Sequence, residues 1–154
     1  MKLTTPSPHR RGYSFIEMLT VIVVFGIMLA MAVLGMAPAL QQAKVRNAAS
    51  VVAGDIQYAQ FLAVRHRRPI AIVVNSSTQQ ILIRDRDNPP GTIYRSRALG
   101  PSTDFALDSL TATPSTVEVY PNGVARQTTT FAVGLDQQSR RVILSRAGQI
   151  RILK

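Results

Sequence analysis

A single carboxylate, Glu17, lies inside a long apolar stretch near the beginning of this sequence. From Tyr13 to Ala43 no other side chain is charged, and the next charged residue is Lys44. A charge inside a membrane-spanning helix costs roughly 2.5–3.5 kcal/mol or more, and such residues therefore pair with one another or carry a function. An acid at this position therefore indicates that Glu17 has a functional role.

The apolar stretch itself is long enough to cross a membrane, because about 20 helical residues span the hydrocarbon core. A secretory signal peptide would have a shorter apolar core, of about 7–15 residues, closed by small residues at a cleavage site. A plain membrane anchor fits the length of 13–43. It leaves Glu17 without a role, unless the helix dipole near the N-terminus stabilises the carboxylate.

The residue types that usually perform catalysis are sparse. There is no cysteine, and neither His9 nor His66 has neighbours at the spacing of a metal site. Asp85 and Asp87 alternate with arginines, a pattern that favours surface ion pairs over a metal site. A glycine-rich phosphate loop is also missing. We therefore predict that the protein is not an enzyme and has no cofactor and no metal.

Basic residues are in excess and gather at the C-terminus. The sequence holds 18 lysines and arginines against 8 acids, for a net charge of +10. Basic side chains could bind phosphates, although no cluster of aromatic residues is present to stack bases. If 149–153 is a strand, alternation places Gln149 and Arg151 on one face and Ile150 and Ile152 on the other. The candidate DNA-binding residues are Arg140, Arg141, Arg146, Arg151 and Lys154.

The element that follows the apolar stretch is predicted to be an amphipathic helix ending before Pro69. Apolar residues recur at three- and four-residue steps, as on the buried face of a helix. They are Val45, Ala48, Ala49, Val52, Ile56, Ala59, Leu62 and Ala63. The predicted opposite, polar face holds Lys44, Arg46, Asn47, Asp55, Gln57 and Gln60.

After Pro69 the pattern becomes that of strands. Residues 70–75 and 80–84 predict a hairpin, and 87–116 is expected to contain one or two short strands. Residues 117–120 and 129–133 predict a second strand pair around a turn at 121–123. Residues 141–145 and 149–153 predict a closing hairpin. One long helix followed only by strands indicates an α+β fold with antiparallel sheet.

The N-terminal residues carry a resemblance. Gly12 is followed by an aromatic residue, Tyr13, and then by Glu17 and the apolar run. This arrangement resembles the class III signal of type IV pilins and type II secretion pseudopilins. The resemblance implies that a prepilin peptidase cuts between Gly12 and Tyr13 and methylates the new terminus. It also implies that Glu17 pairs with the N-terminal amine of a neighbouring subunit. Tyr13 stands where the family usually has Phe.

This resemblance divides the chain into a leader, 1–12, an apolar assembly helix, 13–43, and a periplasmic globular domain, 44–154. The leader would stay in the cytoplasm by virtue of its basic residues. Three of the 18 basic residues and none of the 8 acids lie in it, so the mature chain keeps a charge of +7. The implied location is the bacterial inner membrane, in a single pass, and then a pilus or pseudopilus.

A narrower resemblance comes from the globular part. Residues 59–74, 119–133 and 140–152 resemble the type II secretion protein H and FimT family. This implies a type IV pilin-like fold, in which a long helix packs on antiparallel sheet. It also implies a minor pilin or pseudopilin whose partners are other pilins and the prepilin peptidase.

DNA is the alternative partner, as in FimT-like minor pilins that act in natural transformation. Those proteins carry a C-terminal Gly-Arg-x-Arg sequence. Here Gly148 and Arg151 match the pattern, but Gln149 replaces an arginine. A role in secretion or pilus assembly is therefore favoured over DNA binding. The sequence leaves open which of the two machines the protein serves.

Overall fold

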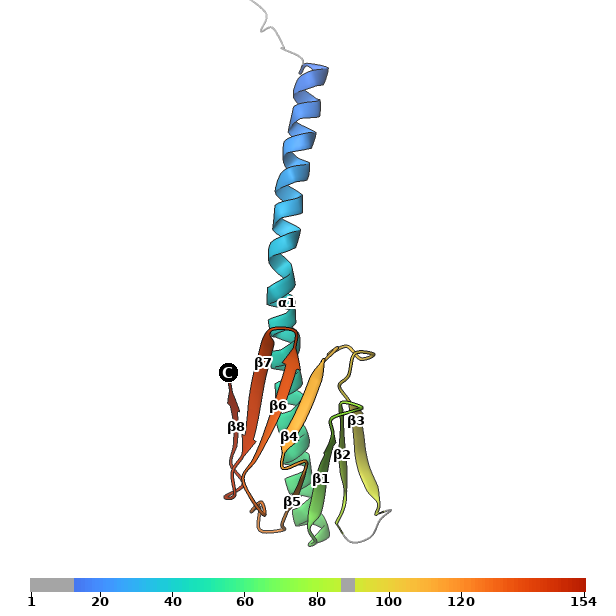
Figure 1. Ribbon diagram of the computed structural model, residues 1–154, viewed down its shortest axis with the longest axis vertical. Helices are drawn as coiled ribbons and strands as arrows, with labels where there is room; N and C mark the ends of the chain where they lie inside the picture. The colour runs from blue at the N-terminus through green and yellow to red at the C-terminus, as the bar shows by residue number, and fades with distance from the viewer. Residues whose placement is uncertain (1–12, 87–90) are drawn as a thin grey trace, which may run out of the picture. The chain divides into compact units, whose positions relative to one another are not determined.

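The computed structural model describes residues 13–86 and 91–154, as one long helix followed by eight strands (Figure 1). The chain forms two compact units that divide at Pro38. The helix α1, Phe15–His66, contributes to both units. The strands are β1 Ile70–Asn75, β2 Gln80–Asp85, β3 Ile93–Ala98, β4 Ser109–Thr113, β5 Thr116–Val119, β6 Thr129–Leu135, β7 Gln138–Leu144 and β8 Ile150–Leu153.

The described part of the first unit is helical and exposes apolar side chains. Its segment Phe15–Ala32 has a mean hydropathy of 2.4 and is long and apolar enough to span a membrane, with none of it buried within the protein. Side chains as large as Phe15 and Phe25 are more than two-thirds exposed. An exposed apolar surface of this extent marks a region that contacts a membrane or another protein.

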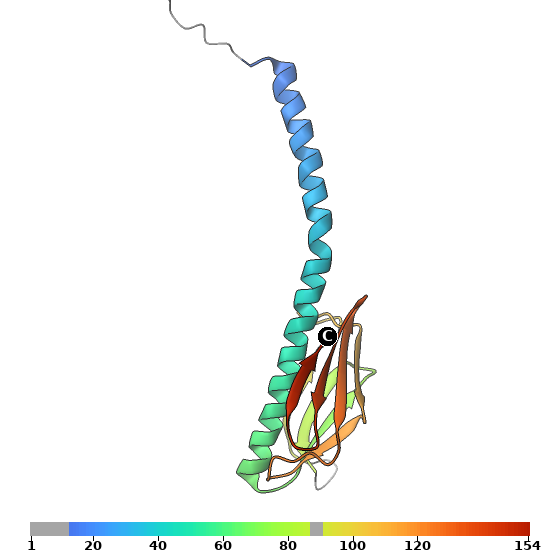
Figure 2. The same ribbon diagram turned by 90° about the vertical axis from the view of Figure 1, so that its left-hand side faces the viewer.

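The second unit contains two antiparallel sheets. The first, sheet A, has the strand order β3-β2-β1-β5, and the second, sheet B, has the order β4-β6-β7-β8. Residues 38–66 of α1 lie along one face of the sheets (Figure 2). The predicted α+β fold with antiparallel sheet is confirmed.

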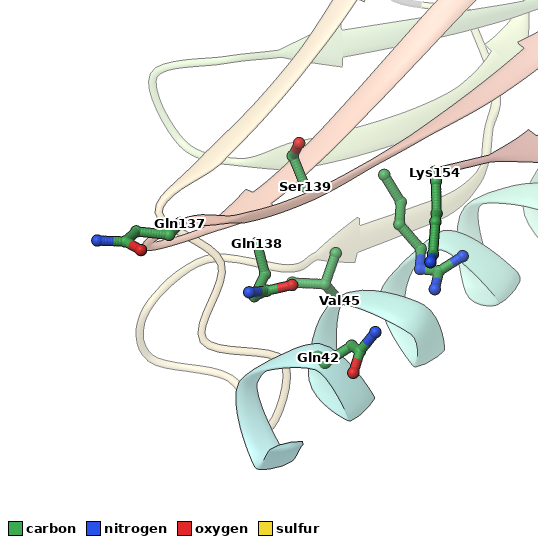
Figure 3. Close-up of a pocket in the computed structure, with 7 residues that line it drawn as sticks. Gln42, Val45, Gln137, Gln138, Ser139 and Lys154 are labelled. Atoms are coloured by element: carbon green, nitrogen blue, oxygen red, sulfur yellow. The ribbon is translucent and has the colours of Figure 1, made fainter. Parts of the chain in front are cut away.

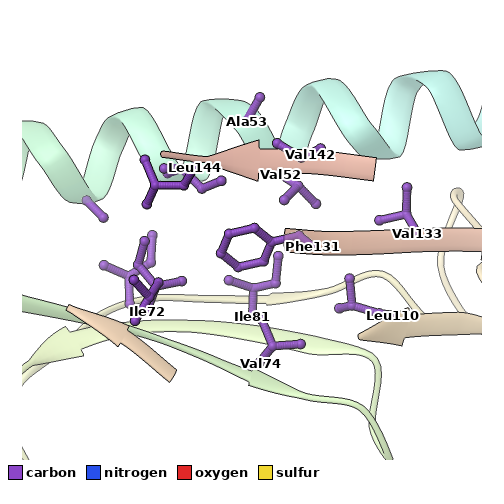
Figure 4. Close-up of a cluster of buried hydrophobic side chains, with 14 of the residues drawn as sticks. Val52, Ala53, Ile72, Val74, Ile81, Leu110, Phe131, Val133, Val142 and Leu144 are labelled. Atoms are coloured by element: carbon purple, nitrogen blue, oxygen red, sulfur yellow. The ribbon is translucent and has the colours of Figure 1, made fainter. Parts of the chain in front are cut away.

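The core of this unit lies between the helix and the two sheets. All eight residues of the predicted apolar stripe on the helix are buried. Phe131 of β6 is fully buried and lies between Val52 of the helix and Ile81 of β2 (Figure 4). The helix ends at His66, and Arg67 takes a left-handed conformation with a φ of 53° before Pro69.

Most of the predicted strands are confirmed. The first hairpin is β1 and β2, with Asn75 paired to Gln80, and the closing hairpin is β7 and β8. One or two short strands were expected within 87–116, and two are present, β3 and β4. The turn at 121–123 is also present, and a single bridge between Val119 and Ala125 closes it.

The predicted pairing of 117–120 with 129–133 is wrong. β5 pairs with β1 in sheet A, whereas β6 lies between β4 and β7 in sheet B. The physical reason is burial. Val117 lies opposite Ile72 and joins the core, and the chain crosses from one sheet to the other after one bridge.

The prediction that Asp55 lies on the solvent-facing side of the helix is also wrong. Its side chain is only 3% exposed. Asp55 accepts hydrogen bonds from Arg95 at 2.8 Å and from Nε of Arg97 at 2.6 Å, both on β3. Arg95 also lies 3.9 Å above the ring of Tyr58. A buried carboxylate with two charged donors fixes the helix against the edge of sheet A.

Candidate functional site

The predicted processing site is only partly described. Gly12 lies outside the described residues. Tyr13 is 80% exposed and precedes the first helical residue, Phe15. An exposed, non-helical residue just before a helix is accessible to another protein, which is what cleavage at this point requires.

Glu17 lies in the first turn of α1, where its backbone N–H donates to the carbonyl oxygen of Ser14 at 3.0 Å. Within the described residues, its carboxylate accepts no hydrogen bond and forms no ion pair. The same side of the helix carries an open apolar groove of about 420 Å³ lined by Glu17, Thr20, Val21, Val24, Phe25 and Met28. The carboxylate therefore stands at the end of an apolar face that can receive a neighbouring helix.

The C-terminal basic residues divide between the two faces of sheet B. Val142 and Leu144 of β7 are buried, so Arg140 shares their core-facing side and Arg141 lies on the opposite, solvent side. On β8, Arg151 lies opposite Ile143, also on the solvent side. This register confirms the predicted alternation for Arg151, with Ile150 and Ile152 beside Leu144 and Val142, while Gln149 precedes the strand.

The structure thus separates the five candidate DNA-binding residues into three places. Arg141 and Arg151 share the solvent face of sheet B, and Arg146 is exposed in the turn between β7 and β8. Arg140 and Lys154 instead line a notch beside α1, together with Arg46. The sequence reasoning missed Arg46. Arg140 could have been placed by extending the alternation of Leu144 and Val142 by one more step.

The strands of sheet B contain no acidic residue. The carboxylates that form ion pairs in the described residues are those of Asp55, Asp85 and Glu118, which come from α1 and sheet A. Asp85 is buried and accepts a hydrogen bond from Arg68 at 2.8 Å. Asp87, named with it as a conceivable metal pair, lies outside the described residues. No group of three potential metal ligands occurs in the described parts of the chain.

Gly148 fixes the turn between β7 and β8 against the rest of the domain. Its φ is 82°, and a Cβ atom at this position would overlap the carbonyl oxygen of Gly123. Gln60 of α1 donates a hydrogen bond to the carbonyl oxygen of Gly148 at 2.8 Å. The glycine of the C-terminal sequence therefore has a packing role, which is independent of any ligand.

These features define a pilin-like structural subunit. The helix has an exposed apolar N-terminal part with a lone carboxylate near its start, and two antiparallel sheets pack on its second half. Residues 48–148 match the model of the type II transport protein GspH family, and residues 7–33 match the prokaryotic N-terminal methylation motif. The chain belongs to the GspH family. The family and the fold are those of structural pilin subunits and not of enzymes.

Solved structures show the same fold. Two crystal forms of the type IV minor pilin FimU from Pseudomonas aeruginosa strain PAO1 are similar to this chain. One has a TM-score of 0.56 at 20% identity and covers 71% of this chain and 92% of the FimU chain. The other has a TM-score of 0.59 at 21% identity and covers 73% and 90%. No curated protein sequence matches the chain.

Proposed function

We propose that this protein is a minor subunit of a type II secretion pseudopilus or a type IV pilus. A prepilin peptidase removes residues 1–12 and methylates the amine of Tyr13. The apolar helix holds the chain in the bacterial inner membrane in a single pass, and the globular domain lies in the periplasm until the subunit joins a filament.

The observation that carries this proposal is the carboxylate of Glu17, which stands at the end of an exposed apolar helix face and follows the Gly12–Tyr13 pair by a few residues. In lipid an unpaired carboxylate is costly. The methylated amine of Tyr13 in a neighbouring subunit keeps its positive charge and offers the missing partner. The match to the N-terminal methylation motif over residues 7–33 supports the same assignment.

The experiment is recovery of the protein with its filament. In cells that assemble pili or an overproduced pseudopilus, the protein should be found in the sheared surface fraction in small amounts relative to the major subunit. Site-specific crosslinking from the apolar groove at Val24 should join it to other pilins. Retention of all the protein in the inner membrane, with no such crosslink, would contradict the proposal.

DNA uptake is the second candidate function. The observation in its favour is the solvent face of sheet B, where Arg141 and Arg151 are exposed and the strands carry no acidic residue. This face carries fewer cations than the sequence suggested. Gln149 stands in place of an arginine, and Arg140 and Lys154 line the notch instead. Assembly through protein partners therefore remains the favoured function.

A further inference from the structure

A small basic cavity lies between α1 and the part of sheet B where β7 begins and β8 ends. Two adjoining cavities of about 270 and 320 Å³ form it, and both are lined by Gln42, Arg140 and Lys154. Figure 3 shows Gln42 and Val45 on the helix opposite Gln138 and Lys154. We refer to the part of the cavity lined by Ala39, Gln42, Ala43, Arg46, Arg140 and Lys154 as the basic notch.

The fold brings the three cations of the notch together from distant parts of the sequence. Arg46 follows the buried residue Val45 on α1 and is itself exposed. Arg140 lies on the core-facing side of β7, just beyond the end of the apolar core, and is half-buried. Lys154 comes directly after Leu153, the residue of β8 that is paired with Arg141.

No aspartate or glutamate side chain lines the basic notch. Within the described residues, the side chains of Arg46, Arg140 and Lys154 form no ion pair and no hydrogen bond with another side chain. The nearby acid on the turn between β6 and β7, Asp136, accepts a hydrogen bond from Gln41 and does not line the notch. Three cations around one cavity repel each other, and an anion in the cavity would offset that repulsion.

The position of the notch along the helix indicates which anion reaches it. A bilayer with its headgroup layers is about 40–45 Å thick, which corresponds to about 27–30 helical residues at 1.5 Å per residue. If the span begins at Tyr13, this length ends close to Ala39–Gln42. Ala39 and Gln42 therefore follow the apolar span directly in the sequence, where the outer headgroup layer is expected. The small side chains of Ala39 and Ala43 leave space beside the cations.

We propose that the basic notch binds the phosphate of an anionic phospholipid headgroup in the periplasmic leaflet of the membrane. The inference rests on the membrane topology of the proposed function. A cavity of about 320 Å³ holds a single headgroup and is too small for a nucleic acid strand to follow. The lipid contact would hold the globular domain at the membrane surface before the subunit enters a filament.

The test uses the full-length protein in neutral detergent micelles, with bound lipid counted by native mass spectrometry. Phosphatidylglycerol, phosphatidylcholine and inorganic phosphate are titrated in separate arms. The notch variant combines R46Q, R140Q and K154Q. The matched control combines R141Q, R146Q and R151Q, which removes the same charge from outside the notch.

The wild-type protein and the control should retain phosphatidylglycerol in preference to phosphatidylcholine. The notch variant should lose affinity by about fivefold for each cation removed, because one basic residue near an anionic surface contributes about that factor. Arg46→Gln alone should show the single fivefold loss. Because Arg46 is exposed on the helix, this single variant should fold normally and report the change in lipid affinity even if the triple variant folds poorly.

Several outcomes would overturn the lipid assignment. One is an equal loss of phosphatidylglycerol affinity in the notch variant and in its control. The others are equal affinity of the wild-type protein for the two lipids, and an affinity for inorganic phosphate as high as that for phosphatidylglycerol. Loss of filament incorporation in the notch variant with an unchanged lipid preference would point to a protein partner. A chain that is inserted and processed normally but lacks the lipid preference would refute the notch alone. A chain that fails to insert would refute the proposed function.

Discussion

Glu17 is the residue on which assembly is expected to depend. Its carboxylate lies on the first turn of α1 at the end of an apolar groove, and its neighbours there are Thr20, Val21 and Val24. The surrounding side chains offer no compensation for a charge in lipid. A carboxylate in this place is tolerable when a second subunit supplies a cation, so we expect its main contribution to be to the assembled state and not to the folding of the monomer.

Replacing Glu17 with Ala should leave membrane insertion and leader cleavage intact, because the change makes the helix more apolar. Entry into filaments should fall strongly, since removal of one member of a buried ion pair can cost about 3–5 kcal/mol. Immunoblots of sheared filaments and crosslinks to partner pilins measure the effect. Thr20→Ala is the control, because Thr20 lines the same groove without a charge. Recovery of both variants at the wild-type level would leave Glu17 with only a helix-capping role.

Individual residues also show where sequence reasoning reached its limit. The buried stripe from Val45 to Ala63 could be predicted because its periodicity is local to one helix. The burial of Asp55 could not, since the arginines that neutralise it come from β3, about 40 residues later in the chain. The polar residue type indicated the solvent face, and only the tertiary pairing with Arg95 and Arg97 reverses that assignment.

Among the elements, the closing hairpin of β7 and β8 is constrained by a glycine in its turn. Gly148 should not tolerate a side chain. A φ of 82° is strained for any residue other than glycine, and an added Cβ would meet the backbone of Gly123. Gly148→Ala should therefore lower the free energy of unfolding by about 2 kcal/mol or more. Urea unfolding of the full-length protein in detergent, followed by circular dichroism, measures the change.

Gly123→Ala is the matched control for that substitution. Gly123 has a similar φ of 79°, but no atom lies within 4 Å of an added Cβ. Gly123→Ala should lower the free energy of unfolding by only about 1 kcal/mol, which is the cost of the left-handed conformation. Equal losses at the two glycines would show that the contact between the two turns does not constrain the hairpin.

The solvent face of the same hairpin carries the DNA hypothesis. If Arg141, Arg146 and Arg151 bind phosphates, the affinity for duplex DNA should fall with salt at a log–log slope of about 0.9 per phosphate neutralised. Replacing Arg146 and Arg151 with Gln should reduce that slope by up to about two, and Gln149→Arg should raise affinity. Gel-shift titrations at several salt concentrations provide the measurement.

The comparison variant for the DNA experiment is Arg126→Gln, because Arg126 is exposed but already paired with Glu118. It should leave the salt slope unchanged. Absence of binding at roughly 50 mM salt, or binding that ignores Arg146 and Arg151, would exclude the hairpin as a DNA site. That result would be consistent with the favoured role in assembly.

A short loop did not by itself make strand pairing predictable, because the hairpin of β6 and β7, joined through residues 136–137, was not predicted. The tight turns after β1 and β7 specify their hairpins, and both were predicted. The turn at 121–123 predicted a third hairpin in the same way. Yet β5 and β6 belong to different sheets, because Val117 and Phe131 are buried in the core beside different neighbours. Local turn chemistry therefore does not determine a partner when burial favours another strand.

On the scale of the whole molecule, the distribution of charge separates the two sheets. In the described residues, the ion-paired acids lie in α1 and sheet A, while the basic residues of sheet B face solvent or the basic notch. The sequence grouped Arg140, Arg141, Arg146, Arg151 and Lys154 as one candidate patch for an anionic partner. The structure offers two separate places, the notch and the solvent face of sheet B, and their variants can be compared directly.

The central claim, that the chain is a pilin-like subunit matured at its N-terminus, is tested most directly by its mature mass. Co-expressed with an active prepilin peptidase, the protein should lose its first 12 residues and begin at an N-methylated Tyr13. Gly12→Leu should leave the full-length chain in the membrane. Intact-mass and N-terminal peptide measurements distinguish these products. An uncut N-terminus with the peptidase active, or a cut downstream of the apolar helix, would contradict the account.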